Sequence, residues 1–149
     1  MSASIETMMY SGETPWHGLG CYVGDEPVDS AEAMTMAGLD WRVGLFPIES
    51  TIRLPDARRI EIHPRHFAVL RDSDDEVLGQ VSEYYRPIQN QEAFAFMDSL
   101  VTEDQDLRYH TAGALRGGRR VWMLARLKNH QIEPVPGDIT EPYLLLTNR

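Results

Sequence analysis

The residues best suited to chemistry lie in the stretch 107–128, which carries six positive charges and no carboxylate. The formal net charge of the whole chain is -9, so this is a local concentration of arginine in an acidic protein. The stretch also contains two aromatic residues, Tyr109 and Trp122. Surfaces that bind single-stranded nucleic acid combine these residue types, because cations follow the phosphates and rings stack on any base. The stretch therefore predicts an anion-binding surface of the nucleic-acid type.

A β-hairpin must position these side chains. Gly117 and Gly118 separate two segments of strand-like sequence, which is the loop length of a tight two-residue turn. This turn pairs Arg116 with Arg119, and paired residues share one face of the sheet. Counting outward gives one basic and aromatic face, made of the pairs Leu115 with Arg120, Gly113 with Trp122, Thr111 with Leu124, and Tyr109 with Arg126. The predicted phosphate ligands are Arg116, Arg119, Arg120 and Arg126, and the predicted stacking residues are Tyr109 and Trp122.

The opposite face of this hairpin is small and apolar, which suits packing under a helix. It holds the pairs Ala114 with Val121, Ala112 with Met123, and His110 with Ala125.

A second interpretation of the basic face stays open. In it the sheet is half buried, Tyr109 and Trp122 join a second small core, and the arginines extend only their charged ends into water.

A second candidate site is the loop TPWHGLG at residues 14–20, with Trp16 and His17 at its centre. Loops often carry chemistry, and glycines allow a close backbone approach, so His17 is a candidate general base. Cys21 follows four residues later and is a candidate nucleophile for that base. The alternative is a structural loop in which Trp16 fills the edge of the core and His17 bonds to the backbone.

Signatures of other chemistry are missing from the sequence. The histidines do not show a metal-binding spacing, and Gly117 with Gly118 is too short for a phosphate-binding loop. We therefore predict no metal, no cofactor and a non-enzymatic role.

Length and composition set the class of protein. With 149 residues and 42% hydrophobic content, the chain is most simply one domain over 1–149. Cys21 is the only cysteine, so an internal disulfide is impossible. Apolar runs fall short of the roughly 20 residues of a membrane span, and the first residues do not resemble a signal peptide. These features predict a cytoplasmic protein without membrane contact.

Patterning along the chain predicts the elements around the hairpin. Asp29 has capping-box spacing to Glu32 and begins a helix near 30–37, and Asn90 is the expected N-cap of a helix at 91–101. Further strands are expected at 41–46, 51–54, 58–63, 66–71, 77–82 and 143–146. This order predicts an α+β fold, with a mainly antiparallel sheet of hairpins and two helices packed on one face.

Several motifs together resemble a family of phage- and plasmid-related proteins of unknown function. They are TPWHGLG in 8–20, AGLDW at 37–41, RPIQN in 85–90, LRGGRRVW in 111–122 and YLLLTN at 143–148. Members of this family are about twice as long, so the chain resembles their amino-terminal half or a shortened relative. The resemblance implies a mobile-element setting, such as replication, recombination or counter-defence. A more distant likeness, at the level of the fold, is to single-strand annealing proteins.

Two functional hypotheses follow. The first is a single-stranded DNA binding or annealing protein of a phage or plasmid. The second is a protein-interaction module for counter-defence or assembly, whose surface is the acidic segment 1–56 with its net charge of -7. Its partner would be a host or phage protein, and a homo-oligomer is compatible with either hypothesis.

Overall fold

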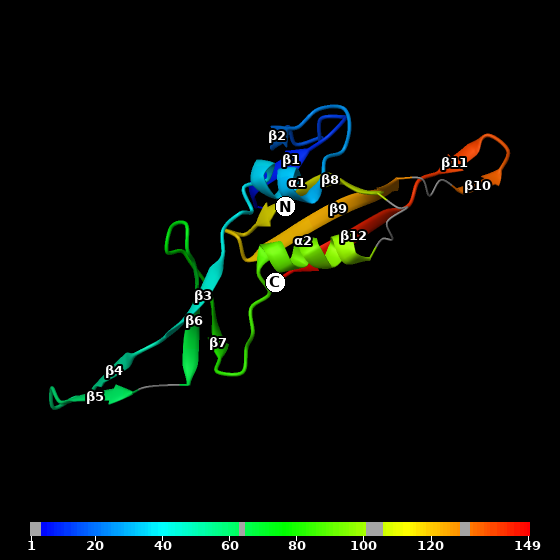
Figure 1. Ribbon diagram of the computed structural model, residues 1–149. Helices are drawn as coiled ribbons and strands as arrows, with labels where there is room; N and C mark the ends of the chain where they lie inside the picture. The colour runs from blue at the N-terminus through cyan, green and yellow to red at the C-terminus, as the bar shows by residue number, and fades with distance from the viewer. Residues whose placement is uncertain (1–3, 63–64, 101–105, 129–131) are drawn as a thin grey trace. The chain divides into compact units, whose positions relative to one another are not determined.

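The computed structural model describes four stretches of the chain, residues 4–62, 65–100, 106–128 and 132–149 (Figure 1). Contacts divide the protein into two compact units, Met1–Asp40 with Ile88–Arg149, and Trp41–Pro87. The single domain expected from the length stays a prediction.

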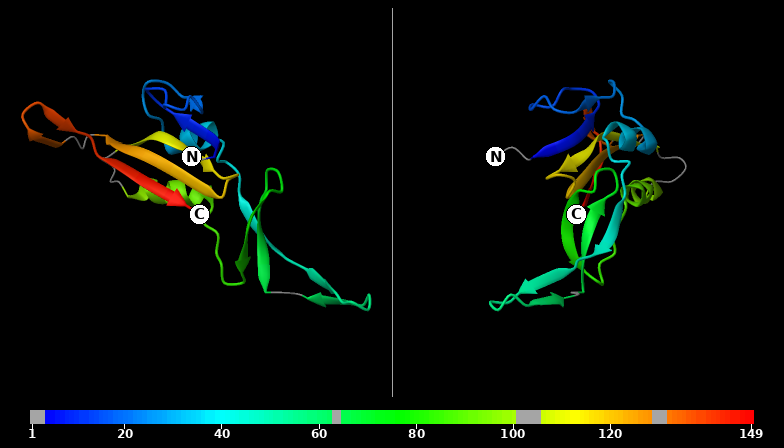
Figure 2. Two further views of the ribbon diagram at one scale, coloured as in Figure 1. Left: turned by 180° about the vertical axis from the view of Figure 1, so that it is seen from behind. Right: turned by 90° about the vertical axis from the view of Figure 1, so that its left-hand side faces the viewer.

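The first unit is built on a five-stranded sheet with the order β12-β9-β8-β1-β2. Neighbouring strands run antiparallel, except that β1 and β2 are parallel. The strands are β1 (Ile5–Tyr10), β2 (Cys21–Tyr22), β8 (Asp106–Leu115), β9 (Arg120–Lys128) and β12 (Tyr143–Asn148). A separate two-stranded hairpin, β10 (Ile132–Val135) and β11 (Asp138–Thr140), lies between β9 and β12 in the sequence. The long β8–β9 hairpin is seen from two further sides in Figure 2.

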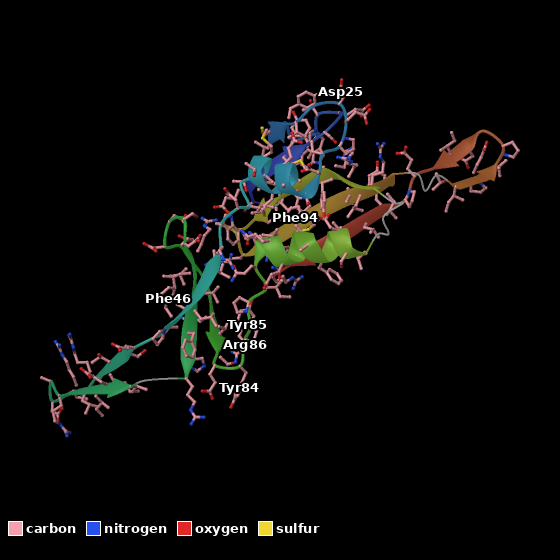
Figure 3. All side chains as sticks on the ribbon, in the orientation of Figure 1. Asp25, Phe46, Tyr84, Tyr85, Arg86 and Phe94 are labelled. Atoms are coloured by element: carbon pink, nitrogen blue, oxygen red, sulfur yellow. The ribbon has the colours of Figure 1, made fainter. Side chains whose placement is uncertain are left out.

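One face of this sheet carries the core of the unit. Met9, Ala112 and Met123 are fully buried and share this face through the pairs Met9 with Ala112 and Ala112 with Met123. On β9, the fully buried Met123 and Ala125 alternate with partly exposed neighbours, as expected for a strand with one covered face. Phe94 lies on α2, next to this core (Figure 3). The helix α1 contacts β1 and β8, and α2 contacts β12.

The two helices begin close to their predicted starts. In α1 (Ser30–Met36), the Asp29 carboxylate accepts a hydrogen bond from the backbone N–H of Glu32 at 2.9 Å. This confirms the predicted cap. In α2 (Asn90–Ser99), the N-cap is Gln89, which forms a capping box with Glu92, so the prediction of Asn90 as cap is wrong by one residue. Asn90 is instead buried inside the first turn, where its Nδ2 donates to the carbonyl of Leu39 at 3.0 Å.

The second unit consists of antiparallel strands with short connections. A three-stranded sheet has the order β3-β6-β7, and a separate hairpin pairs β4 with β5. These strands are β3 (Val43–Pro47), β4 (Ser50–Arg53), β5 (Arg59–Ile62), β6 (His66–Arg71) and β7 (Val77–Ser82). Arg71 is largely buried and donates to both carboxylate oxygens of Asp74, at 2.8 and 2.7 Å.

The α+β class and the antiparallel hairpins are confirmed. The predicted strands at 66–71 and 77–82 agree with the structure at both ends. The strands β1, β2, β10 and β11 were not predicted. Within the described stretches, no helix has the length and apolar character that crossing a membrane requires.

Candidate nucleic-acid interface

The turn of the β8–β9 hairpin is longer than predicted. The strands end at Leu115 and begin again at Arg120, so Arg116 and Arg119 lie in the turn and not in the ladder. Arg116, Gly117 and Gly118 all have positive φ angles, of 55°, 68° and 85°. A two-residue type I′ turn needs positive φ only at its two central residues, so the additional left-handed residue, Arg116, belongs to a four-residue turn and not to the strand. The predicted Arg116–Arg119 cross-strand pair is therefore wrong.

Arg116 occupies a conformation that glycine adopts at lower cost. For a residue with a Cβ, the left-handed region costs roughly 1–2 kcal/mol. The backbone N–H of Arg116 donates to the carbonyl of Ser4 at 2.9 Å, which joins the turn to the segment leading into β1. A strained arginine in an exposed turn is a reason to look for a role of its side chain.

Three arginines at the turn end of the hairpin, Arg116, Arg119 and Arg120, lack acidic partners among the described residues. Arg116 and Arg119 are exposed and Arg120 is partly exposed. Within the part of the chain that the structure describes, none of the three forms an ion pair. Their charges therefore remain available to an external anion.

Arg126 differs from these three arginines. Its guanidinium lies 3.4 Å from the carboxylate of Glu141 and 3.7 Å from that of Glu26, and 23% of its side chain is exposed. These two carboxylates compensate its charge. Arg126 is thus poorly suited to the role of phosphate ligand that the sequence predicted for it.

Tyr109 is a clear correction. Its side chain is fully buried, its hydroxyl donates to Asp98 Oδ1 at 2.8 Å, and its ring lies 5.0 Å from that of Phe94. Burial, and secondly the Asp98 carboxylate, raise the pKa of Tyr109 well above its usual range. A side chain in this position cannot stack on a base.

A register shift between Tyr109 and Thr111 explains this burial. The predicted pairs from Leu115–Arg120 to Thr111–Leu124 are confirmed, but Tyr109 pairs with Ala125 and not with Arg126. The irregularity takes up one extra residue on β8, and such a bulge moves the following side chains to the other face. Tertiary contacts hold it there, since Tyr109 exchanges two backbone hydrogen bonds with Val28, at 2.7 and 3.1 Å. The predicted pair of His110 with Ala125 is wrong for the same reason.

Trp122 lies where the hairpin prediction placed it, opposite Gly113. Its indole lies across this glycine, and a Cβ at position 113 would overlap both the indole and the backbone oxygen of Thr7. Trp122 itself is only partly exposed. The absence of a side chain at Gly113 therefore defines how the indole lies on the sheet.

The amino-terminal loop presents its aromatic residues at the corner of a turn. The backbone N–H of Gly18 donates to the carbonyl of Pro15 at 2.8 Å, with Trp16 and His17 between them. The Nδ1 of His17 accepts from the backbone N–H of Leu19 at 3.1 Å, so neutral His17 carries its proton on Nε2. The predicted backbone bond of His17 is confirmed. The prediction that Trp16 fills the edge of the core is wrong, because 89% of Trp16 is exposed.

The pairing of His17 with Cys21 as base and nucleophile finds no support. The thiol of Cys21 is exposed and donates weakly to the carbonyl of Tyr22, at 3.9 Å. Within the described stretches, histidine, cysteine, aspartate and glutamate side chains do not form a group of three or more that could hold a metal ion.

The two sites predicted separately meet at one cavity of about 400 Å³ in the first unit. Trp16 and His17 line it from the loop, and Trp122 lines it from the hairpin, more than one hundred residues later in the sequence. Its remaining lining residues are Ser4, Ile5, Met8, Leu19 and Leu115. The volume is within the range of about 300–1,000 Å³ that small-molecule pockets occupy.

The strand β1 contributes to this site, although its sequence pattern did not predict a strand. Ile5 and Met8 belong to a strand that pairs with β8, through Ile5 with Leu115 and Met8 with Gly113. The alternation within residues 5–10 is weak, because Met8, Met9 and Tyr10 are all buried. A period-two pattern could not reveal a strand covered on both faces.

Comparison with protein families adds one finding. Residues 77–149 match a domain of unknown function, DUF932. The DUF932 match includes α2, the whole β8–β9 hairpin and β12. It agrees with the resemblance to a family of unknown function, whereas the phage or plasmid setting stays a prediction. The chain matches no curated protein, and it matches no solved structure.

Proposed function

We propose that this protein binds single-stranded nucleic acid at the turn end of the β8–β9 hairpin, as a non-enzymatic DNA-binding or annealing protein of a phage or plasmid. One observation carries the proposal. Three arginines without acidic partners among the described residues, Arg116, Arg119 and Arg120, lie within five residues of the chain and close to Trp122, which lines the aromatic cavity. This arrangement provides cations for phosphates and a ring for a base at the same place.

The charge of the rest of the protein favours a small contact over a long one. Because the whole protein has a net charge of -9, most of its surface away from the turn repels a polyanion. A duplex-binding protein requires a broad basic stripe that follows the backbone. A compact group of three arginines suits the flexible backbone of a single strand better.

In this proposal both helices pack on the sheet face that carries Tyr109. The opposite face of the sheet is then free to bind the ligand. Its support is that the Tyr109 hydroxyl reaches Asp98 on α2 and that α1 contacts β1 and β8. On the opposite face, Leu145 of β12 is 64% exposed and pairs with Leu124 of β9. In this proposal the protein acts in the cytoplasm.

Fluorescence anisotropy of a labelled single-stranded oligonucleotide tests the proposal. Three phosphate contacts to a single strand predict an affinity that falls about 20-fold between about 50 and 200 mM salt. A matched duplex should bind more weakly. Arg120→Gln should reduce both the affinity and its dependence on salt, whereas Arg65→Gln, an arginine of the second unit, should leave both unchanged. Flat titrations at both salt concentrations, from folded protein, would overturn the proposal.

A protein-interaction module is the second candidate, and exposed apolar side chains favour it. In the β4–β5 hairpin, the cross-strand partners Ile52 and Ile60 are 44% and 48% exposed. In the β10–β11 hairpin, Ile132 and Ile139 are 58% and 59% exposed. Apolar groups on projecting hairpins suit contact with another protein, whether a host or phage protein or a second copy of the chain. Co-purification of a partner together with no affinity for oligonucleotides would favour this function over the first.

A further inference from the structure

The cavity beside the turn has a lining that suits an aromatic ring. Three ring systems, those of Trp16, His17 and Trp122, face it together with the aliphatic and thioether groups of β1, the loop and β8. Among the described residues that line it, none is an aspartate, glutamate, lysine or arginine. Such a pocket binds the flat, weakly polar face of a heterocycle and excludes a phosphate, whose charge it cannot compensate.

Cationic groups lie at the rim of this cavity and not inside it. Arg120 is two residues before Trp122 on the same strand, so both side chains are on one face, about 7 Å apart along β9. Arg116 lies next to two residues that line the cavity. It directly follows Leu115, and the backbone N–H of Arg116 donates to the carbonyl of Ser4. Charges outside an apolar pocket match a ligand whose anionic backbone flanks an inserted ring.

The loop leaves Trp16 almost entirely in water. The residue is 89% exposed although it borders the cavity, and its ring lies 5.3 Å from that of His17 at an angle of 71°. An indole left in water is an unused stacking surface, since covering a large apolar ring stabilises by a few kcal/mol. The Nε2–H of His17 adds one hydrogen-bond donor, which a carbonyl oxygen on the edge of a base can accept.

We infer that this cavity holds one unstacked nucleobase of a bound single strand, stacked against Trp16 and Trp122, while the arginines of the turn bind the phosphates on either side. The inference rests on the proposed function and goes beyond it, because it names the group that is recognised and the residues that recognise it. Base insertion gives an affinity that depends on the bases, whereas the arginines alone give one that depends only on the phosphates.

The test compares two strands with the same phosphates. One is a short oligothymidylate, and the other is an oligonucleotide of equal length in which every sugar is abasic. Wild-type protein should bind the thymidylate at least about 10-fold more tightly, the effect expected of one stacked base. Trp16→Ala should remove most of this difference and leave the affinity for the abasic strand unchanged. Because Trp16 is almost fully exposed, this variant should unfold at the temperature of the wild type.

Tyr84→Ala is the matched control, since Tyr84 is an aromatic residue of the second unit that is 79% exposed. It should keep the full preference for thymidylate. If the wild type binds both strands equally, or if Trp16→Ala keeps the preference, the base pocket is wrong and the proposed function stands. If neither strand binds to folded protein, the base pocket and the proposed function both fail.

Discussion

The indole of Trp122 lies across the backbone of Gly113, and the carbonyl oxygen of Thr7 approaches the same point, where the Cβ of a larger residue would lie. Three strands therefore meet at a position that has no side chain, since Thr7 is on β1, Gly113 on β8 and Trp122 on β9. The close approach of these three strands at Gly113 fixes the position of the Trp122 indole, which lines the cavity. A methyl group at position 113 cannot be accommodated by a side-chain movement alone, because one of the two neighbours is backbone.

Gly113→Ala should destabilise the protein and displace the indole. Overpacking of this kind costs about 1–3 kcal/mol, and the backbone contact with Thr7 favours the upper end. Urea denaturation followed by circular dichroism measures the loss. The matched control is Gly79→Ala on β7, where an added Cβ meets no atom within 4 Å, and this change should leave the free energy of unfolding unchanged or raise it by up to about 1 kcal/mol. Equal stability of the two variants would show that the packing at Gly113 is looser than described.

Arg116→Gly separates the charge of the turn from its conformation. Glycine adopts the positive φ of 55° without strain, so the free energy of unfolding should be unchanged or should rise by up to about 1 kcal/mol. The loss of one phosphate contact should reduce the slope of log affinity against log salt by about 0.7. Anisotropy over a range of salt concentrations measures this slope. A variant with unchanged stability and an unchanged slope would exclude Arg116 from the interface.

Tyr109→Phe should affect stability and not binding. The variant loses the hydrogen bond from the hydroxyl to Asp98 at 2.8 Å, so the free energy of unfolding should fall by about 1–3 kcal/mol. Affinity for a single-stranded oligonucleotide should stay at the wild-type value, because the ring is buried against α2. Weaker binding by a stable, folded Tyr109→Phe protein would contradict this assignment.

Alkaline pH gives an independent measure of the same contact. Burial and Asp98 raise the pKa of Tyr109 in the folded protein, whereas the unfolded tyrosine ionises near its ordinary value of 10.0. Above that pH the unfolded state releases a proton that the folded state keeps, so stability falls as the pH rises. Urea midpoints between pH 9 and 11 should fall less in Tyr109→Phe than in the wild type.

His110 should make the first unit less stable in mild acid. Burial, and secondly the nearby charge of Arg126, lower the pKa of His110, although Glu141 acts in the opposite direction. Below the ordinary value of 6.5 the unfolded state therefore binds a proton that the folded state does not, and stability falls as the pH falls. Urea midpoints should drop from pH 7 to pH 5 in the wild type and drop less in His110→Gln. Parallel pH profiles of the two proteins would show that His110 does not contribute.

Elements formed by neighbouring residues could be predicted from the sequence. The capping of α1 by Asp29 needs only contacts within one turn of helix. The β6–β7 hairpin and the β8–β9 pairs near the turn follow from the alternation of apolar and polar residues and from the short connection between the strands. A short connection leaves each strand few other partners for pairing. For the same reason, the position of Trp122 opposite Gly113 was predicted correctly.

Contacts between distant segments decided the rest. Val28 bonds to the backbone of Tyr109 and maintains the shift that turns this side chain into the core, while Glu26 and Glu141 take up the charge of Arg126. Neither effect has a local sequence signal, because its energy comes from residues brought together only by the fold.

By itself, the sequence determined the composition of the candidate site, namely a basic hairpin and an aromatic loop in an acidic protein. Only the tertiary structure decided which of these residues act together. It removed Tyr109 from the surface and brought Trp16 and His17 to the same cavity as Trp122. The physical reason is that periodicity specifies which side chains share a face of one element, whereas long-range packing specifies which faces meet.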